Sequence, residues 1–203
     1  MRTTTPYPDE LPIFSLGNPL FPAGLLHLNI FEPRYLAMTA DCIRHGKPFG
    51  VSLIRAGFEV GVPAVPSAIG CTARIIEWSQ PMTDRYRLVA KGETMFKIIS
   101  RRVADDGLML AKVELIDPPD PLALPSHHAG LAALIKELIE ALGDDAPLPK
   151  PRRFDDAAWV ACRLAELLPI PPERKQKLLE ATRPLAMLSD VETLLRDLRD
   201  DRS

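Results

Sequence analysis

The hydrophobic pattern of this chain changes at Asp117. Before that residue the apolar side chains come in short, often alternating runs, whereas after it they follow the spacing of helical faces. Alternation is typical of strands and the longer spacing of helices. The change coincides with Pro118, Pro119 and Pro121, and proline disfavours both a helix interior and a central strand. The sequence therefore predicts an α+β protein, with a β-rich subdomain over residues 1–117 and a helical subdomain over residues 118–203.

The β-rich subdomain contains several runs that have the length and composition of strands, separated by glycine, proline and aspartate. The expected strands cover Leu11–Leu16, Leu25–Ile30 and residues 49–55, 71–79, 85–90, 96–103 and 109–116. In the last of these, every second residue from Met109 is apolar, as expected of a strand that covers a core. Asp105, Asp106 and Gly107 supply a tight turn, so the final two strands should form a hairpin.

One helix is expected inside the β-rich subdomain, from about residue 31 to His45. Pro33 suits its first turn, where a missing N–H costs nothing, and the Glu32 carboxylate suits the positive end of the helix. Gly46 provides a C-terminal stop. The apolar spacing of the helix predicts a buried stripe formed by Tyr35, Met38 and Cys42.

The helical subdomain is expected to contain helices over residues 126–142, 155–168, 173–180 and 191–199. Ser189 and Glu192 have the spacing of a capping box that would begin the last helix. Residues 143–151 are rich in proline and aspartate, which predicts a mobile surface loop open to proteolysis. His127 and His128 should lie in solvent at a helix start, because adjacent helical residues point about 100° apart and cannot easily share a metal ion.

Composition narrows the functional classes. The formal net charge is −2, which gives a nucleic acid little long-range attraction. Cys42, Cys71 and Cys162 are widely spaced, so neither a disulfide framework nor a zinc site is indicated, and no metal or other cofactor is expected. The N-terminus lacks the apolar core of a secretion signal, and no apolar run approaches the roughly 20 residues of a membrane span. We therefore expect a cytoplasmic protein.

Short motifs spread over nearly the whole chain resemble the Lon N-terminal domain family. They are Leu11-Pro12-Ile13-Phe14-Ser15-Leu16, Leu20-Phe21-Pro22, Ile30-Phe31-Glu32-Pro33-Arg34-Tyr35, Phe49-Gly50-Val51, Gly70-Cys71-Thr72, Lys91-Gly92-Glu93 and Arg174-Lys175-Gln176-Lys177. The run that ends at Tyr35 is the most specific. Two positions depart from the family pattern: Ala23 replaces a usual glycine, and Met95 stands where arginine is common.

The resemblance implies a PUA-like β pseudo-barrel with one inserted helix, followed by a C-terminal helical bundle, which agrees with the pattern analysis. It also implies the recognition of polypeptides, as in the substrate-binding domain of Lon proteases. The sequence has no Gly-x-x-x-x-Gly-Lys-[Ser/Thr] phosphate loop and no counterpart of the Ser–Lys peptidase domain. We therefore expect a stand-alone, non-catalytic member of this family that acts in protein quality control, as an adaptor for unfolded or tagged polypeptides or for a protein partner.

Two groups of residues are candidates for particular roles. The signature residues are expected to be structural, because a carboxylate at a helix start and a nearby arginine stabilise the helix; they are Phe31, Glu32, Pro33, Arg34, Tyr35, Gly70 and Gly92. The polypeptide-binding residues are expected to lie around a turn at residues 78–84, where aromatic and methionine side chains form an adaptable surface. They are Phe21, Trp78, Met82 and Tyr86.

Two alternative functions stay open at this point. Arginines at positions 85, 87, 101 and 102 could bind RNA, although neighbouring strand residues face opposite sides of a sheet and so divide such a patch. A hydrolase with an unrecognised site is the other alternative. No histidine or cysteine has a nearby partner in the sequence that would activate it for catalysis.

Overall fold

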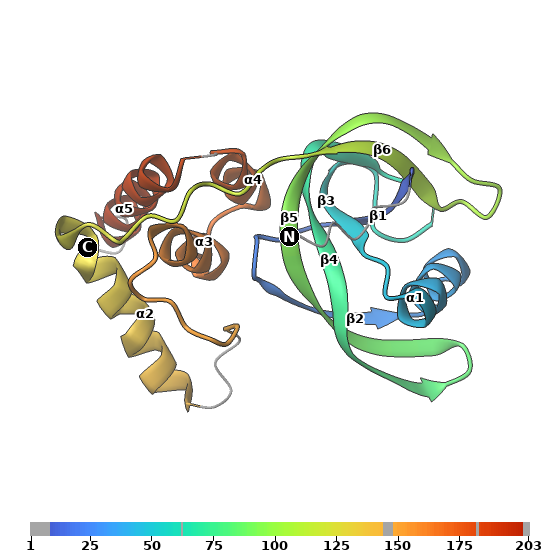
Figure 1. Ribbon diagram of the computed structural model, residues 1–203, viewed down its shortest axis with the longest axis horizontal. Helices are drawn as coiled ribbons and strands as arrows, with labels where there is room; N and C mark the ends of the chain where they lie inside the picture. Colours follow the sequence, from blue (N-terminus) through green and yellow to red (C-terminus); the bar gives the residue numbers. More distant parts are fainter. Residues whose placement is uncertain (1–8, 62, 144–147, 182, 201–203) are drawn as a thin grey trace, which may run out of the picture. The chain divides into compact units, whose positions relative to one another are not determined.

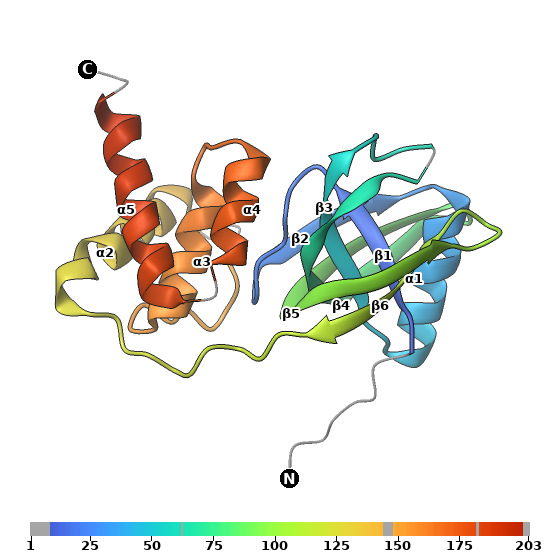
Figure 2. The ribbon, with the colours of Figure 1, turned by 90° about the horizontal axis from the view of Figure 1, so that it is seen from above.

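The computed structural model describes residues 9–61, 63–143, 148–181 and 183–200. The chain divides into two compact units, Met1–Asp117 and Pro118–Ser203. The first unit contains all six strands of a single mixed sheet and one helix, whereas the second contains the remaining described helices (Figures 1 and 2).

Five strands of the first unit close into a ring, and the sixth lies outside it. The strands are β1 (Leu11–Leu16), β2 (Leu25–Ile30), β3 (Phe49–Ala56), β4 (Val65–Met82), β5 (Arg85–Val103) and β6 (Met109–Leu115). Their order is β2-β5-β4-β3-β1-β6, and β6 pairs again with β5 to close the ring. Only the β1–β3 pair is parallel among these pairings.

The long strands β4 and β5 correct the expected boundaries. The expected strands at residues 85–90 and 96–103 are a single strand, β5, and the expected strand at residues 71–79 extends over all of β4. Glycine weakens a strand, and so Gly92 suggested a break in the sequence pattern. In the structure β5 instead continues through Gly92, with a shift of register between Cys71 and Ala73 on its partner β4.

Gly92 is the point at which β5 passes against another segment of backbone. Ala23 donates its backbone N–H to the Gly92 carbonyl over 2.8 Å, and Gly92 donates in turn to the carbonyl of Gly24 over 2.9 Å. A methyl group at Gly92 would overlap the carbonyl oxygen of Phe21. The turn before β2 therefore holds the centre of β5 by these two backbone hydrogen bonds, a contact that we call the clasp. Only glycine fits at the point of contact.

The interior of the ring is filled by an apolar cluster that depends on two further glycines. The cluster comprises Leu11, Ile13, Phe96, Met109 and Ala111. A Cβ atom at Gly50 would lie 2.6 Å from the Ile13 side chain and 2.9 Å from the Phe96 ring, and one at Gly70 would also overlap that ring. These two glycines leave the space that the buried Phe96 ring occupies.

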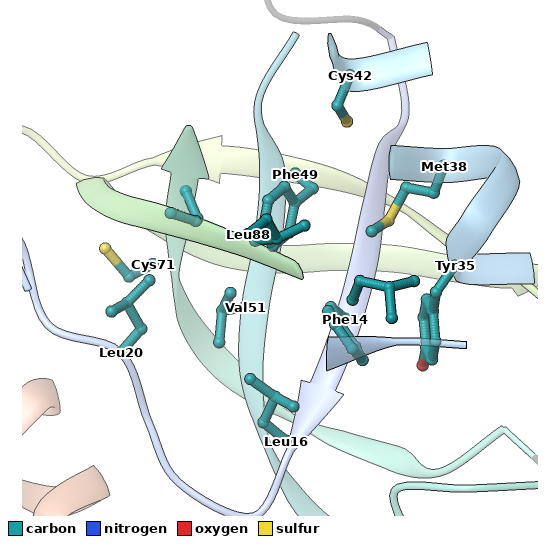
Figure 3. Packing of buried hydrophobic residues seen from close by; sticks show 13 residues of the cluster. Phe14, Leu16, Leu20, Tyr35, Met38, Cys42, Phe49, Val51, Cys71 and Leu88 are labelled. Atoms are coloured by element: carbon teal, nitrogen blue, oxygen red, sulfur yellow. The ribbon is translucent and has the colours of Figure 1, made fainter. Parts of the chain in front are cut away.

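A larger apolar cluster lies between the sheet and helix α1 (Pro33–His45), as Figure 3 shows. The helix contributes the expected stripe of Tyr35, Met38 and Cys42, all of which are buried. The Tyr35 ring packs on Phe14 of β1 with a centroid separation of 4.0 Å. The helix ends as expected at Gly46, whose φ of 62° is left-handed.

The second unit is a group of helices arranged around α3. It consists of a short 3-10 turn, η1 (Ser126–His128), followed by α2 (Ala129–Leu142), α3 (Ala157–Leu167), α4 (Pro172–Glu180) and α5 (Pro184–Asp200). Helix α3 contacts α2, α4 and α5. The Asp156 side chain caps α3 by accepting a hydrogen bond from the Trp159 backbone N–H over 3.0 Å.

Two expectations for the second unit are wrong. Helix α5 begins at Pro184, so Ser189 lies inside it and bonds back to the Leu185 carbonyl instead of forming a capping box. His128 is buried, and its Nδ1 atom lies 2.8 Å from Oε1 of Glu192 on α5. That contact spans 64 positions in the sequence and is invisible to a local pattern.

The expected mobile loop falls partly outside the described residues, because residues 144–147 are not described. Leu148, which follows them, is buried. The expected loop therefore includes at least one buried apolar side chain, which its proline- and aspartate-rich composition did not predict.

The contact at Gly92 predicts that Gly92→Ala will destabilise the protein. The new methyl group must displace the Phe21 backbone, and overpacking of this kind costs about 1–3 kcal/mol in the free energy of unfolding. Urea denaturation followed by circular dichroism measures the loss. Gly130→Ala on α2 is the control, because nothing lies within 4 Å of its added methyl group. It should be neutral or stabilise by up to about 1 kcal/mol. Equal stabilities for the two variants would contradict the clasp.

The positive φ of Ala23 predicts that substitution by glycine will stabilise the protein. It is the one non-glycine residue with a positive φ, 62°, in the described part of the chain. A left-handed conformation costs alanine about 1–2 kcal/mol, and the extra flexibility of unfolded glycine returns about 0.5–1 kcal/mol of that cost. We expect Ala23→Gly to stabilise by about 0.5–1 kcal/mol in the same assay. Ala111→Gly, at a buried strand position, should destabilise instead.

Candidate polypeptide-binding surface

The β4–β5 hairpin continues beyond the ring, where its apolar residues reach solvent. The last β3–β4 pair along this direction is Phe49 with Ala73, so β4 from residue 74 onward pairs only with β5. The hairpin, in green at the lower right of Figure 1, extends beside β2 and α1. Its turn consists of Thr83 and Asp84 alone, because Trp78 lies in β4 and not in the longer turn expected from the sequence.

The structure brings two of the four predicted binding residues together. Trp78 and Tyr86 meet edge to face with ring centroids 6.1 Å apart. Trp78 is 53% exposed, whereas Tyr86 is half-buried against the core beneath α1. Large, rigid aromatic rings with one exposed face are frequent anchors in protein interfaces.

Met82 lies on the opposite face of the hairpin from this aromatic pair. Cross-strand partners share a face, and Trp78 pairs with Leu88 whereas Met82 pairs with Arg85. Arg85 and Leu88 are three positions apart, so their side chains point to opposite faces. A shift of register between Ser79 and Met82 produces this change. Met82 is nevertheless 61% exposed.

Phe21 is not part of any surface. It is fully buried beside Gly92, in the turn that clasps β5, and therefore presents no side-chain surface to a ligand. The predicted single groove of four residues is thus divided between the core and two faces of a hairpin. Ile76 was missed by the sequence analysis, and it is an exposed apolar residue of the same strand.

The signature residues at the start of α1 tie the helix to the ring. The buried Arg34 guanidinium lies 2.9 Å from the Glu32 carboxylate and donates to the Gly107 carbonyl over 3.3 Å. The same guanidinium stacks over the Tyr35 ring, and burial raises the pKa of the Tyr35 hydroxyl. Phe31 and Pro33 differ from Arg34 and Tyr35 because they are exposed.

One of the four arginines considered for RNA binding is already paired with a carboxylate. Arg102 forms an ion pair with Glu10, with its Nε 2.9 Å from Oε1 of the carboxylate. The hydrogen bond from Arg102 lowers the pKa of the Glu10 carboxyl. Arg101 is the next residue along β5 and therefore points to the other face. No observation on these side chains favours an RNA interface.

The described residues contain no group of three or more histidine, cysteine, aspartate or glutamate side chains that could hold a metal ion. Likewise, none of the described helices has the length and apolar character needed to cross a membrane.

The comparisons with known proteins agree with this geometry. The family model of the ATP-dependent protease La (LON) substrate-binding domain matches residues 10–197. A crystal structure of a Lon N-terminal domain protein from Xanthomonas campestris is 32% identical, with a TM-score of 0.75, and the match covers 91% of this chain and 97% of that chain. The chain therefore belongs to the Lon substrate-binding domain family.

More distant relatives show the same fold. The N-terminal domain of the Mycobacterium avium complex Lon protease is 12% identical with a TM-score of 0.62, over 93% of this chain and 98% of that chain. The α+β pseudo-barrel with an inserted helix and following helices is thus confirmed. The Lon protease of Anaeromyxobacter dehalogenans is 26% identical over 95% of this chain but only 24% of its own length. This chain spans about a quarter of that relative.

The burial of Cys42 and Cys71 and the partial burial of Cys162 predict that the cysteines react slowly in the folded protein. Desolvation raises the pKa of the Cys42 and Cys162 thiols to about 12, and Cys71 is fully buried. At a pH of about 8, roughly one part in ten thousand of either raised thiol would be the reactive thiolate. A coloured disulfide reagent should therefore label the native chain slowly and all three cysteines promptly in guanidinium. One native thiol that reacts at the rate of free cysteine would contradict this burial.

Proposed function

We propose that this protein binds unfolded segments of polypeptide, without catalysing a reaction, through the aromatic face of the β4–β5 hairpin. The proposal rests on the contact between Trp78 and Tyr86. This contact lies on the part of the hairpin where β4 no longer pairs with β3. Membership of a substrate-binding family supports it. The two units act as separate domains in this proposal, and the first contains the binding surface.

The chemistry of the hairpin suits an unfolded polypeptide better than a folded partner. An exposed aromatic ring gains most from covering the apolar side chains that unfolding reveals. The uncovered edge of β4 also presents backbone N–H and C=O groups to an extended chain. Neither feature requires a particular sequence in the ligand, and both are available without rearrangement of the ring.

A role as an adaptor in the cytoplasm extends the proposal. The relatives that share this domain are named as Lon proteases, and in this chain the same domain would present polypeptides to a protease partner. Three free cysteines are compatible with a reducing compartment.

A matched pair of substitutions tests the aromatic face. Trp78→Asp should weaken the binding of a reduced, carboxymethylated unfolded protein by about 1–3 kcal/mol, because it removes an anchor and leaves a charge to be desolvated. Met82→Asp introduces the same charge on the opposite face at similar exposure, and it should change the affinity little. Fluorescence titration measures both affinities, and a thermal melt of each variant establishes that it folds.

Other outcomes separate the possible explanations. Equal weakening by the two variants would show that binding spreads over both faces of the hairpin. A loss confined to Met82→Asp would place the site on the other face. If Trp78→Asp lowered the melting temperature and left the affinity unchanged, Trp78 would be a packing residue and the proposal would fail.

A further inference from the structure

A cavity of about 230 Å³ opens at the edge of the sheet, on the far side of β2 from β5. Its walls come from β1, β2, the start of α1 and the segment that follows β3. The apolar lining includes Leu28, Ile30 and the exposed side chains of Phe31 and Val60. Cavities that enclose a whole small-molecule ligand usually measure about 300–1,000 Å³, so this one suits a side chain or two of a longer ligand.

The wall that β2 provides is its backbone edge. Every residue of β2 from His27 to Ile30 lines the cavity, although alternate residues of a strand point to opposite faces. A strand can contribute consecutive residues in this way only along its edge. β2 is the last strand of the sheet order, so its outer edge has no strand partner among the described residues.

The hydrogen-bond pattern identifies which backbone groups of this edge are available. Gly92 donates to the Gly24 carbonyl, and the register continues as Leu26 with Ala90 and Leu28 with Leu88. In an antiparallel pair every second residue bonds to its partner strand. Leu26 and Leu28 therefore bond to β5, whereas His27 and Asn29 direct their N–H and C=O groups outward, toward the cavity side.

The charges around the cavity are of one sign. Glu32 and Glu59 both line it, and no lysine or arginine among the described residues does. Glu32 is already paired with Arg34, which lies outside the lining. The exposed Glu59 carboxylate accepts one hydrogen bond from the Gly17 backbone N–H, so its second oxygen can meet a cation. Such a rim favours lysine or arginine beside the apolar residue that enters the cavity.

We propose that β2 accepts an extended polypeptide segment as an added strand, with an apolar side chain in the cavity and a neighbouring lysine or arginine against Glu59. This site rests on the proposed function and refines it, because it names the class of segment that is bound. It is centred on a different strand from Trp78, although the two sites adjoin, because Ile30 of the cavity lining pairs with Tyr86 of the aromatic face. Pairing at the edge fixes the direction of the segment, and the cavity with Glu59 selects its side chains.

Charge selection is tested with two synthetic peptides, end-capped and labelled, that share a central leucine flanked either by lysines or by glutamates. Anisotropy titrations should show the wild-type protein binding the lysine peptide about tenfold more tightly. Glu59→Lys should abolish or reverse this preference, and Glu59→Gln should reduce it. Glu114→Lys, an exposed β6 position with the same change of charge, should leave the preference intact. A preference that survives Glu59→Lys overturns the site.

Strand addition is tested by methylating the backbone nitrogens of the lysine peptide one at a time. Loss of an inter-strand hydrogen bond should weaken binding by about tenfold or more at alternate positions and little at those between. A uniform response along the peptide would contradict an added strand, even if the charge preference held.

The same titrations separate this site from the proposed function. If the carboxymethylated unfolded protein binds and Trp78→Asp weakens it, but the two peptides bind equally, the site at β2 is wrong and the hairpin proposal stands. If the lysine peptide binds with the expected pattern and Trp78→Asp has no effect on either ligand, the β2 site stands and the hairpin proposal is wrong. No binding of any of these ligands refutes both.

Discussion

The first unit depends on one strand that pairs with three others. β5 bonds to β2 and β4 along its first half and to β4 and β6 further on, so it belongs to the ring and also holds the outlying strand β2. The register of this 19-residue strand with β4 shifts beside Gly92, and at the same point the strand passes close to the backbone of the turn before β2. Gly92, held between the carbonyl of Gly24 and the N–H of Ala23, is where that close approach occurs.

This arrangement divides the unit into a packed part and an open part. The ring, β2 and α1 enclose both apolar clusters, and the Arg34 guanidinium holds the helix to the turn at Gly107. The β4–β5 hairpin and β2 lie outside the ring, where one long edge of each has no strand beside it. The backbone groups available to a ligand are therefore those on the strand edges that do not take part in closing the ring.

Local patterns predicted the elements well where both ends carried a turn signal, and less well elsewhere. β1 and β2 have the expected bounds because alternating apolar residues lie between proline, glycine and polar positions. β5 was divided in two because a glycine in an extended strand looks like a break unless its opposing segment is known. The burial of His128 depended on a partner in another helix, and no spacing in the sequence reveals such a partner.

The candidate site was harder to predict for the same reason. Aromatic and methionine residues near a turn were correctly placed on a hairpin, but a shift of register within it sent Met82 to the face opposite Trp78. Phe21 was expected on the binding surface, whereas the turn that packs against β5 buries it. The cavity beside β2 is built from separate segments of the chain, and its lining could only be seen once they were folded together.

The antiparallel pairing of Leu11 with Ala111 brings the first strand of the ring beside the last. The chain thus enters and leaves this unit at one end of the ring, which is the geometry of a module that can be inserted into a loop of another protein. The same geometry permits a circular permutation: a short linker could join the two ends, and new termini could open at the exposed turn between Thr83 and Asp84. Every strand pairing would survive that rearrangement, although the chain would begin with β5 and β6 and end with β4.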